Sequence, residues 1–388
     1  MQVDISTIAE KENNVDLGID LEWCRQTQFC KWGRAGKGRI PMSVAEMDFR
    51  PHPGIGKALS HYILADQTAY IPPLGHPDVR EAIAKFQSKR YNIDLELDHI
   101  VCSGGVRQTI SYLLRTFLKE QDQILFIGSP IYSAIHNIII NIGCSWSVLP
   151  YDALCKNTIN ETALSLVEGQ VRVVIVTSPH NPTGRLLSLE EKESIAKYAE
   201  AHNAIIISDE VYEHLFEPAT CSSISLTNKY TEMNTLSISG FGKSFNIGGY
   251  RTAFVTHRGD KINNVMQKWG ENVFSCSSLS QYAALACTVV ADDWLPIIIA
   301  ELIKNQDTVA LELKKSDRII VPPAGNGMFA WFGVNCDIDL SSVCSAASID
   351  VMGGEAFFFG DKRWVRMNIA TSNELVSSAC RSIVKRLT

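Results

Sequence analysis

From about residue 55 onward, the apolar positions of the chain follow two alternating patterns, of which the first is helical. Residues 77–90 place apolar side chains every three or four positions and carry a proline near their start, which predicts a helix. Residues 108–119 predict a second helix, entered through two glycines. A third helix begins with SLEE at 188–191, the pattern of a capping box, and is expected to end near residue 201.

Short apolar runs, several of them rich in β-branched residues, form the second pattern. The predicted strands are residues 124–127, 173–176, 204–207, 236–239 and 253–256. Continuous apolar runs are typical of parallel strands that are buried on both faces. Strands that alternate with helices in this way predict an α/β fold built on a doubly wound, mostly parallel sheet.

The pattern changes again at about residue 285, where long helical segments begin. Two apolar strand-like runs follow, at 327–333 and 364–370, and together they predict a smaller α+β domain. The predicted division has an N-terminal arm and part of the small domain over 1–54, a large domain over 55–284 and a small C-terminal domain over 285–388. The polar arm is expected to lie over a partner subunit.

Composition narrows the class of protein. The 388 residues are 46% hydrophobic and 20% charged, as in ordinary globular proteins, and the net charge of −6 argues against a nucleic-acid or anionic-membrane partner. The apolar run at 138–142 is interrupted by Asn141 and is too short to span a bilayer. Eleven scattered cysteines without a CxxC pair, together with a start that lacks a signal-peptide pattern, indicate a cytoplasmic protein. The histidines show no metal-binding spacing, so no metal is expected.

The stretch 239–251 carries the most informative chemistry. Lys243 lies in a glycine-rich turn after a strand, and its neighbours Phe241 and Phe245 are apolar. Desolvation lowers the pKa of a lysine and makes its amine available as a nucleophile or Schiff-base former. Arg251 provides a planar fork that suits a phosphate, so the pair indicates pyridoxal phosphate (PLP). The plain alternative is an ordinary turn with a surface lysine; a P-loop is disfavoured because Ser237 stands where its first glycine belongs.

Four polar residues come just after predicted strands: Tyr132, Asn181, Asp209 and Lys243. In doubly wound sheets the ligand lies beyond the carboxyl ends of the strands. Asp209 either caps a helix, pairs with an arginine or pairs with a protonated pyridine nitrogen. Tyr212, expected on the same helical face as Asp209, could bond the phenolic oxygen of the cofactor. Tyr132 either stacks on the cofactor ring or belongs to the core.

Two further features suit anions. Gly104, Gly105 and Val106 open a helix, whose free N–H groups and dipole favour a phosphate, although a plain helix start is the alternative. Arg366 lies within the apolar strand 365–370. A buried arginine needs an anion, and we expect either a substrate carboxylate or an internal salt bridge.

Four ordered motifs, SPHNPTG (178–184), SDEVYE (208–213), GKSFNIGGYR (242–251) and VRMNIA (365–370), resemble those of the fold-type-I PLP enzymes of the class I/II aminotransferase superfamily. The resemblance covers about residues 42–383 and implies a role for each candidate. On this resemblance Lys243 would be the Schiff-base lysine and Asp209 would pair with the pyridinium nitrogen. Asn181 and Tyr212 would bond the ring oxygen, and Tyr132 would stack on the ring. The phosphate would be held by Gly104, Gly105, Val106 and Arg251, and the amino-acid substrate would be bound by Arg366, Ala45 and Asn181. It also implies a homodimer in which Tyr70 reaches the phosphate of the neighbouring subunit.

The chain departs from this pattern in one place. Family members usually have hydroxyl residues just before the lysine, one of them bonded to the phosphate, where this sequence has Gly240 and Gly242. That bond is therefore either missing or made by another group. The N-terminal segment, with Lys31 and Trp32 followed by IPMSVAEMDF at 40–49, resembles the cystathionine β-lyase-like (C–S lyase) branch. Arg251, in contrast, is more typical of aminotransferases.

The core residues leave the reaction open. Lys243 would remove the Cα proton of an amino acid as general base, and transamination, β- or γ-elimination and cyclisation all follow from that step. Transamination is the favoured prediction, with a lyase or a cyclising enzyme of specialised metabolism as alternatives. A non-catalytic binding protein of the same fold is disfavoured, because the chain keeps the lysine, the aspartate and both arginines.

Overall fold

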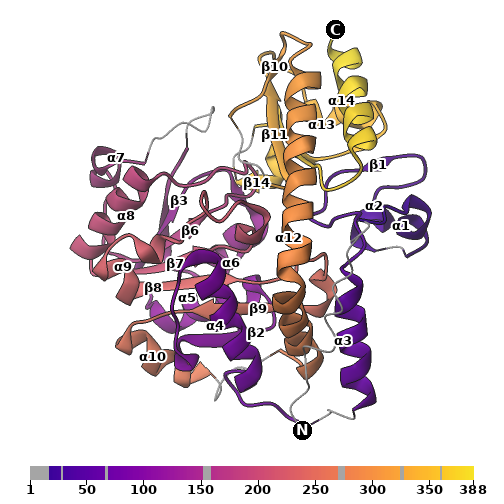
Figure 1. Cartoon of the computed structure of the whole chain (residues 1–388). Helices are drawn as coiled ribbons and strands as arrows, with labels where there is room; N and C mark the ends of the chain where they lie inside the picture. Colours follow the sequence, from indigo (N-terminus) through magenta and orange to yellow (C-terminus); the bar gives the residue numbers. More distant parts are fainter. Residues whose placement is uncertain are drawn as a thin grey trace.

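The computed structural model describes the chain except for residues 1–16, 28, 66–68, 152–158, 270–275, 324–326 and 359–360. Its larger part is built on a seven-stranded sheet with the strand order β2-β9-β8-β7-β6-β3-β5 (Figure 1). The strands are β2 (Ile100–Ser103), β3 (Gln123–Ile127), β5 (Ser145–Leu149), β6 (Val171–Thr177), β7 (Ile205–Asp209), β8 (Thr235–Ser239) and β9 (Ala253–Thr256). All neighbouring pairs are parallel except those of β9, which runs antiparallel to β8 and β2. The predicted fold class is confirmed.

Sequence patterns predict five of these strands and miss two. The missed strand β5 lies at an edge of the sheet and is exposed or half-buried throughout, so it lacks the continuous apolar run of the inner strands. The missed strand β2 is fully buried, but it has only four residues and directly precedes the glycines of the next helix. A short apolar run of that kind does not by itself separate strand from helix.

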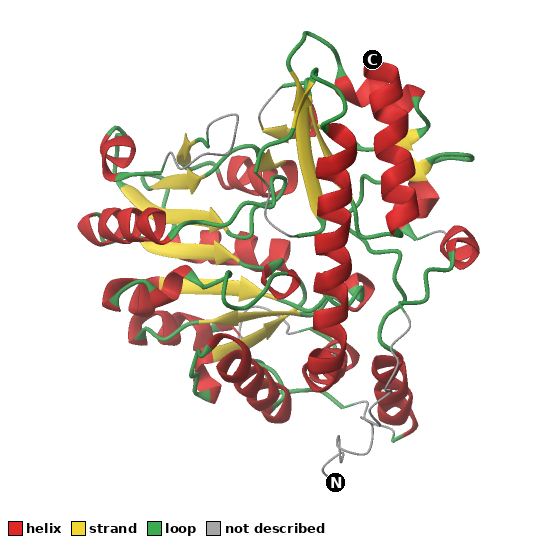
Figure 2. Ribbon diagram, turned by 45° about the horizontal axis from the view of Figure 1, so that its top comes forward, coloured by secondary structure: helices red, strands yellow, loops and turns green. Residues whose placement is uncertain are grey.

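Helices cover both faces of the sheet (Figure 2). Side chains of α5 (Val106–Phe117), α6 (Ser133–Ile142) and α10 (Asp260–Gln267) share one core with alternate strand residues such as Val173 and Ile175. Side chains of α7 (Glu161–Ser165) and α8 (Leu189–Ala201) share another core with the intervening residues, and α9 (Lys229–Asn234) lies beside them. This alternation is the doubly wound arrangement that the continuous apolar strands predict.

Three predicted helices are present, one with different ends. Helix α4 (Pro77–Tyr91) matches its predicted range, and α8 begins with the predicted capping box between Ser188 and Glu191. Helix α5 begins at Val106 rather than at residue 108 and ends at Phe117, two residues before the predicted end. It begins early because Gly105 is already its N-cap residue, with a φ of 131°.

The smaller part is an α+β unit. Four antiparallel strands, in the order β10-β11-β15-β13, pack against α13 (Leu340–Ala346) and α14 (Asn373–Leu387). The strands are β10 (Ile319–Ile320), β11 (Phe329–Val334), β13 (Met352–Gly353) and β15 (Trp364–Asn368). The N-terminal segment carries α1 (Leu21–Thr27), α2 (Cys30–Arg34) and α3 (Pro53–Leu64), and its strand β1 (Ile40–Pro41) pairs with β12 (Ile349–Asp350). The N-terminal segment therefore contributes to the smaller unit.

Helix α12 (Ser278–Leu313) runs through both parts of the molecule (Figure 1). Its first half packs against α3 and α4, and its last turns pack against α14. By length and composition it could cross a membrane, but 61% of its most apolar 18-residue window is buried inside the protein. The predicted domain boundary between residues 284 and 285 falls inside this helix, so the exact division of the chain into domains stays a prediction. A second link is the pairing of β14 (Phe357–Phe358) with β4 (Ile131–Tyr132).

The segment 42–50 crosses between the two parts with little regular secondary structure, and two asparagine side chains satisfy its backbone. Asn368 donates to the carbonyl oxygens of Val44 and Glu46 at 2.5 and 2.6 Å, and Asn246 donates to those of Met47 and Phe49 at 3.0 and 2.7 Å. Asn246 also accepts a bond from the Met47 amide at 3.1 Å. Asn246 comes from the larger part and Asn368 from the smaller one, so the segment is tied to both.

We expect N368A to lower the free energy of unfolding by about 2–4 kcal/mol, because it leaves two carbonyl groups of the segment without their donor. Asn335, which directly follows β11, is exposed and its side chain bonds one carbonyl, so N335A should change stability by less than about 1 kcal/mol. Chemical denaturation of both variants tests this. Equal losses for the two would contradict the role of Asn368.

Candidate active site

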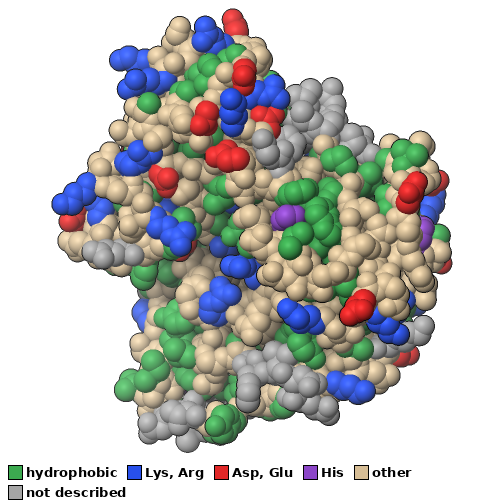
Figure 3. Space-filling view, turned by 180° about the vertical axis from the view of Figure 1, so that it is seen from behind, with side chains coloured by type: hydrophobic (Ala, Val, Ile, Leu, Met, Phe, Trp, Pro, Cys, Tyr) green, Lys and Arg blue, Asp and Glu red, His purple; other side chains and the backbone are tan. Residues whose placement is uncertain are grey.

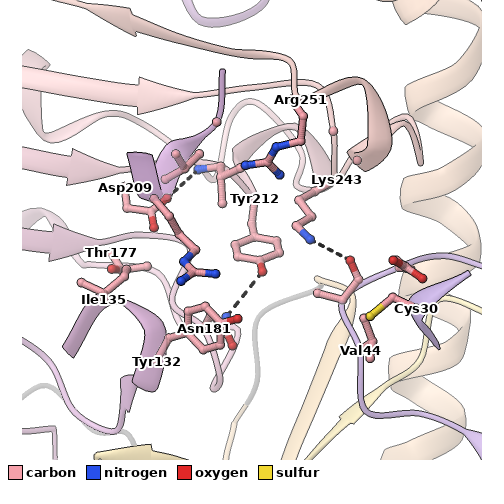
Figure 4. A pocket seen from close by; sticks show the side chains of 18 of the residues that line it. Cys30, Val44, Tyr132, Ile135, Thr177, Asn181, Asp209, Tyr212, Lys243 and Arg251 are labelled. Atoms are coloured by element: carbon pink, nitrogen blue, oxygen red, sulfur yellow. Dashed lines mark hydrogen bonds between the residues drawn. The ribbon is translucent and has the colours of Figure 1, made fainter. Parts of the chain in front are cut away.

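A cavity of about 430 Å³ opens where the carboxyl ends of the parallel strands meet the smaller part and the N-terminal segment. Side chains from the larger part and from the N-terminal segment point into it (Figure 4), and Met352 and Arg366 of the smaller part line it as well. Predicted site residues in its lining are Ala45, Gly105, Val106, Tyr132, Asn181, Asp209, Tyr212, Lys243, Arg251 and Arg366. Gly104 adjoins this set without lining the cavity, and Tyr70 does not line it. On one face of the molecule, Lys and Arg side chains gather around a central hollow (Figure 3).

Lys243 is held at the mouth of the turn that follows β8. Its Nζ donates to the Ala45 carbonyl at 2.8 Å (Figure 4), and the neighbouring side chains of Phe241 and Phe245 are fully buried. Burial lowers the pKa of the Lys243 amine to about 8, and the positive charge of Arg366 contributes to the same shift. The amine is therefore partly neutral close to physiological pH, as a nucleophile or general base requires.

Asp209 is the last residue of β7 and not the first residue after it. The expectation that Tyr212 shares a helical face with Asp209 is wrong, because a turn follows the strand and Tyr212 caps a short 3₁₀ helix. The two side chains still reach the same cavity. Asp209 accepts one bond from the Val211 amide at 3.2 Å, but burial raises the pKa of its carboxyl to about 7.

Arg366 is almost fully buried in β15 and has no carboxylate within ion-pair distance among the described residues. One of its Nη atoms donates to Asn181 Oδ1 at 2.7 Å, the other donates to the Ser43 carbonyl, and the guanidinium lies 4.2 Å from the ring centre of Phe329. Its Nε finds no partner in the described part of the chain. The internal salt bridge considered from sequence is therefore not formed there, and the group is left for an anion.

Asn181 and Tyr212 form the floor of the same region. Asn181 donates from Nδ2 to the Tyr212 hydroxyl at 3.4 Å (Figure 4). Its Oδ1 accepts the bond from Arg366. Burial raises the pKa of the Tyr212 hydroxyl above its usual value, so this group stays protonated and able to donate. The amide thus orients both a hydroxyl and a guanidinium toward one space.

The start of α5 and Arg251 form a cup suited to a phosphate. Gly105, at a φ of 131°, approaches the guanidinium so closely that a Cβ there would lie 2.1 Å from an Nη atom of Arg251. No side chain caps the N-terminus of α5, so its first amide groups remain available. Within the described residues Arg251 has no ion-pair partner. Free amides, a helix dipole and an unpaired guanidinium together favour an anion.

Two predicted residues lie at the edges of this arrangement. Tyr132, in β4, is half-buried, and its ring centre is 6.4 Å from that of Phe357 in the paired strand. It lines the cavity wall, so its role against a cofactor ring stays a prediction. Tyr70 is fully exposed at the surface. Its contact with a second copy of the chain, and the dimer itself, stay predictions.

Several residues of the cavity were given no role in the sequence analysis, although some of them lie within its motifs. Arg34, Glu46, Arg107, Asn246 and Thr252 all line it. Glu46 accepts a bond from the Lys31 amide at 2.9 Å, and Lys31 in turn forms a buried ion pair with Asp48 at 3.0 Å. The motif at 31–49 points to this region, but nothing in its spacing shows which side chains face the cavity.

The donor set fits the PLP that the sequence resemblance implies. A partly neutral lysine amine and a buried carboxyl with a raised pKa reach the same cavity, and an anion cup lies beside them. A second unpaired arginine offers room for a carboxylate. These are the groups that would hold the aldehyde, the ring nitrogen and the phosphate of this cofactor, together with an amino-acid carboxylate.

The comparisons with known proteins agree with this interpretation. An aspartate aminotransferase of Thermotoga maritima is 27% identical over 352 residues, 89% of this chain and 90% of that protein. Two solved structures share the fold: the aspartate aminotransferase of Rhizobium meliloti (20% identity, TM-score 0.81, 96% and 98% of the two chains) and a C–S lyase of Staphylococcus hominis (19%, 0.81, 98% and 96%). The family of class I and II aminotransferases matches residues 38–383, and the chain therefore belongs to that family.

Proposed function

We propose that the protein is a PLP-dependent aminotransferase that acts at the Cα atom of an L-amino acid. The observation that carries the proposal is that the Lys243 amine, the Asp209 carboxyl and the unpaired Arg366 guanidinium all face one cavity. When bound there, PLP supplies an electron sink that stabilises the negative charge left at Cα after a proton is removed. The residues of the chain have to hold the cofactor, orient the substrate and remove its Cα proton.

Lys243 has two tasks in this proposal. Its amine would hold the cofactor covalently, and as a free amine it would take the Cα proton of the substrate as general base. The lowered pKa of about 8 supports both tasks, because a substantial fraction of the amine is neutral near pH 7.5. Its bond to the Ala45 carbonyl fixes the direction of the nitrogen without adding a negative charge that would keep it protonated.

Asp209 lines the cavity and would pair with the pyridine nitrogen of the cofactor. Without a cationic partner the buried carboxyl resists ionisation, and its pKa rises to about 7. A pyridinium beside it reverses that preference, because an opposite charge in a low-dielectric site favours the carboxylate. The pair would keep the ring nitrogen protonated, which the electron sink requires.

Arg366 and Asn181 orient the substrate. The guanidinium has an Nε without a partner in the described residues, and it faces the same space as Lys243. An arginine binds a carboxylate through two parallel hydrogen bonds, which fixes the position of the attached Cα as well as the charge. Asn181 keeps the guanidinium in place through its Oδ1.

Transamination is favoured over elimination by the aminotransferase family match and by Arg251. The alternative of a β- or γ-eliminating lyase, or of a cyclising enzyme, is supported by the N-terminal motif at 31–49. We also propose a homodimer with shared active sites, in which the exposed Tyr70 meets the phosphate of the second copy. A cytoplasmic location is consistent with the ten described cysteines, all of which are free.

Transamination can be followed through the visible absorption of the cofactor in the holoenzyme. Adding single L-amino acids should convert the cofactor to its amine form, with loss of the visible band, and a keto acid should restore the band. Release of ammonia with a persisting band would instead identify an eliminating enzyme. Borohydride should fix the cofactor to Lys243 in the wild type and leave K243A unlabelled; a label on another lysine would contradict the assignment.

We expect R366Q to raise the KM for the amino acid about 10–100-fold, as the loss of a charge-assisted contact predicts, while the protein still binds the cofactor. R363Q is the matched control, because Arg363 is exposed near the same strand and pairs with Asp361. Steady-state kinetics of both variants, with the spectrum of each, tests the role of Arg366. An unchanged KM in R366Q would exclude it as the carboxylate site.

The apoprotein of D209N should be more stable than the wild type at pH 8. The pKa of Asp209 rises from 3.8 to about 7 on folding, so the folded state binds the extra proton and wild-type stability falls as the pH rises from about 4 to 7. At pH 8 the difference should be roughly 2–4 kcal/mol, and it should shrink toward pH 4.5. Urea titrations of the two apoproteins at both pH values measure it; a pH-independent difference would contradict the burial argument.

A further inference from the structure

The turn before Lys243 lacks the hydroxyl groups that related enzymes place there, and the structure shows why one of them is excluded. A Cβ on Gly240 would lie 2.4 Å from the carbonyl oxygen of Thr252, so no serine fits that position without moving the backbone. Gly242 has more room, since the nearest atom to its Cβ would be 3.4 Å away. The backbone of Thr252 therefore occupies the space beside the first glycine.

The side chain of Thr252 is the unexplained polar group of this region. The residue directly follows Arg251 and lines the cavity, and it is only 6% exposed. Its Oγ1 is buried and makes no hydrogen bond to any residue that the structure describes. A hydroxyl left unpaired in this way costs about 1–3 kcal/mol, so a partner from outside the chain is expected.

The position of the hydroxyl relates it to the missing group. Oγ1 of Thr252 lies 4.0 Å from the point that a Cβ of Gly242 would occupy. It therefore stands next to the glycine where a hydroxyl residue would otherwise extend toward the phosphate. The guanidinium of the preceding Arg251 packs against Gly105 at the start of α5, so Arg251 connects Thr252 with the helix N-terminus of the anion cup.

We propose that Thr252 donates its hydroxyl hydrogen to the phosphate of the cofactor and so takes the place of the hydroxyl group that Gly240 and Gly242 cannot supply. The hydroxyl hydrogen rotates freely, so a phosphate oxygen at this wall of the cavity can accept it. Bonds from hydroxyl groups to an ionised oxygen are about twice as strong as neutral ones. The inference rests on the cofactor and on the phosphate cup proposed above for Arg251.

A buried hydroxyl group without a partner is not by itself the reason for choosing Thr252. Thr235 and Thr371 also have buried hydroxyl groups without a partner among the described residues, but neither lines the cavity. Thr235 begins β8, the strand that ends before the Gly240 turn, so it offers the same chemistry at the far end of the same strand. It is the matched control for the loss of a buried, unpaired threonine hydroxyl.

The experiment compares the affinity of the apoprotein for PLP and for pyridoxal, which lacks the phosphate, by absorption titration. T252V should raise the Kd for PLP about 10-fold or more and leave the Kd for pyridoxal unchanged, as the loss of one bond to a charged group predicts. T252S should stay within about 3-fold of the wild type for both ligands, because it keeps the hydroxyl. T235V should change neither Kd.

A second variant, R251Q, distinguishes a failure of the inference on Thr252 from a failure of the phosphate cup proposed for Arg251. R251Q should lose more PLP affinity than T252V and should also leave pyridoxal unaffected. If R251Q shows this loss and T252V binds both ligands like the wild type, the inference on Thr252 is wrong and the phosphate cup stands. If T252V weakens PLP and pyridoxal equally, Thr252 is structural and the inference is wrong. If R251Q does not change the ratio of the two Kd values, the phosphate lies elsewhere and both proposals fall. Thr252→Ala replaces Thr252→Val if the valine variant does not fold.

Discussion

An excess of positive charge in one cavity is the constraint around which the rest of the molecule is organised. Arg34, Arg107, Lys243, Arg251 and Arg366 line the cavity, against the two carboxyl groups of Glu46 and Asp209. Buried cations that lack counter-ions are unfavourable unless a ligand brings negative charge. This cost falls on Arg366, which is almost fully buried without a carboxylate partner among the described residues, whereas Arg34, Arg107 and Arg251 are exposed; an anionic substrate at Arg366 would relieve it. The cations that would bind the cofactor and the substrate are thus also the groups that would position them for the reaction.

The positions of these cations depend on backbone that is not part of any regular element. Arg366 points into the cavity because the Ser43 carbonyl and the Asn181 amide hold its two ends. The carbonyl of Ala45 holds Lys243 from the opposite side. Residues 43 and 45 belong to a segment whose backbone is satisfied in part by asparagine side chains from both parts of the molecule. The asparagine side chains thus form hydrogen bonds with the backbone of this segment, as neighbouring strands do with each other in a sheet.

The sequence is sufficient to predict most of the sheet and the strand-end residues, for a physical reason. Parallel strands such as β6 and β7 are apolar on both faces, so their runs stand out, and the side chains that follow them must meet at one edge. The edge strand β5 has no such signature. Three-residue spacing predicts a shared helical face for Asp209 and Tyr212, whereas the chain turns after Asp209. Local spacing cannot report such a turn. Local sequence patterns do not identify residues that act through long-range contacts. Asn246 and Asn368 are examples, because their partners in the segment 42–50 are about 200 and 320 positions away.

The long helix α12 gives the molecule a mechanical property. Pro296 lies in its interior and has no amide hydrogen, so one bond of the helical ladder is missing at that point and bending is easiest there. The turns before Pro296 pack with the part that carries Lys243, and the last turns pack with the part that carries Arg366. The helix therefore joins the part that carries Lys243 to the part that carries Arg366, and its hydrogen-bond ladder is interrupted between its two ends.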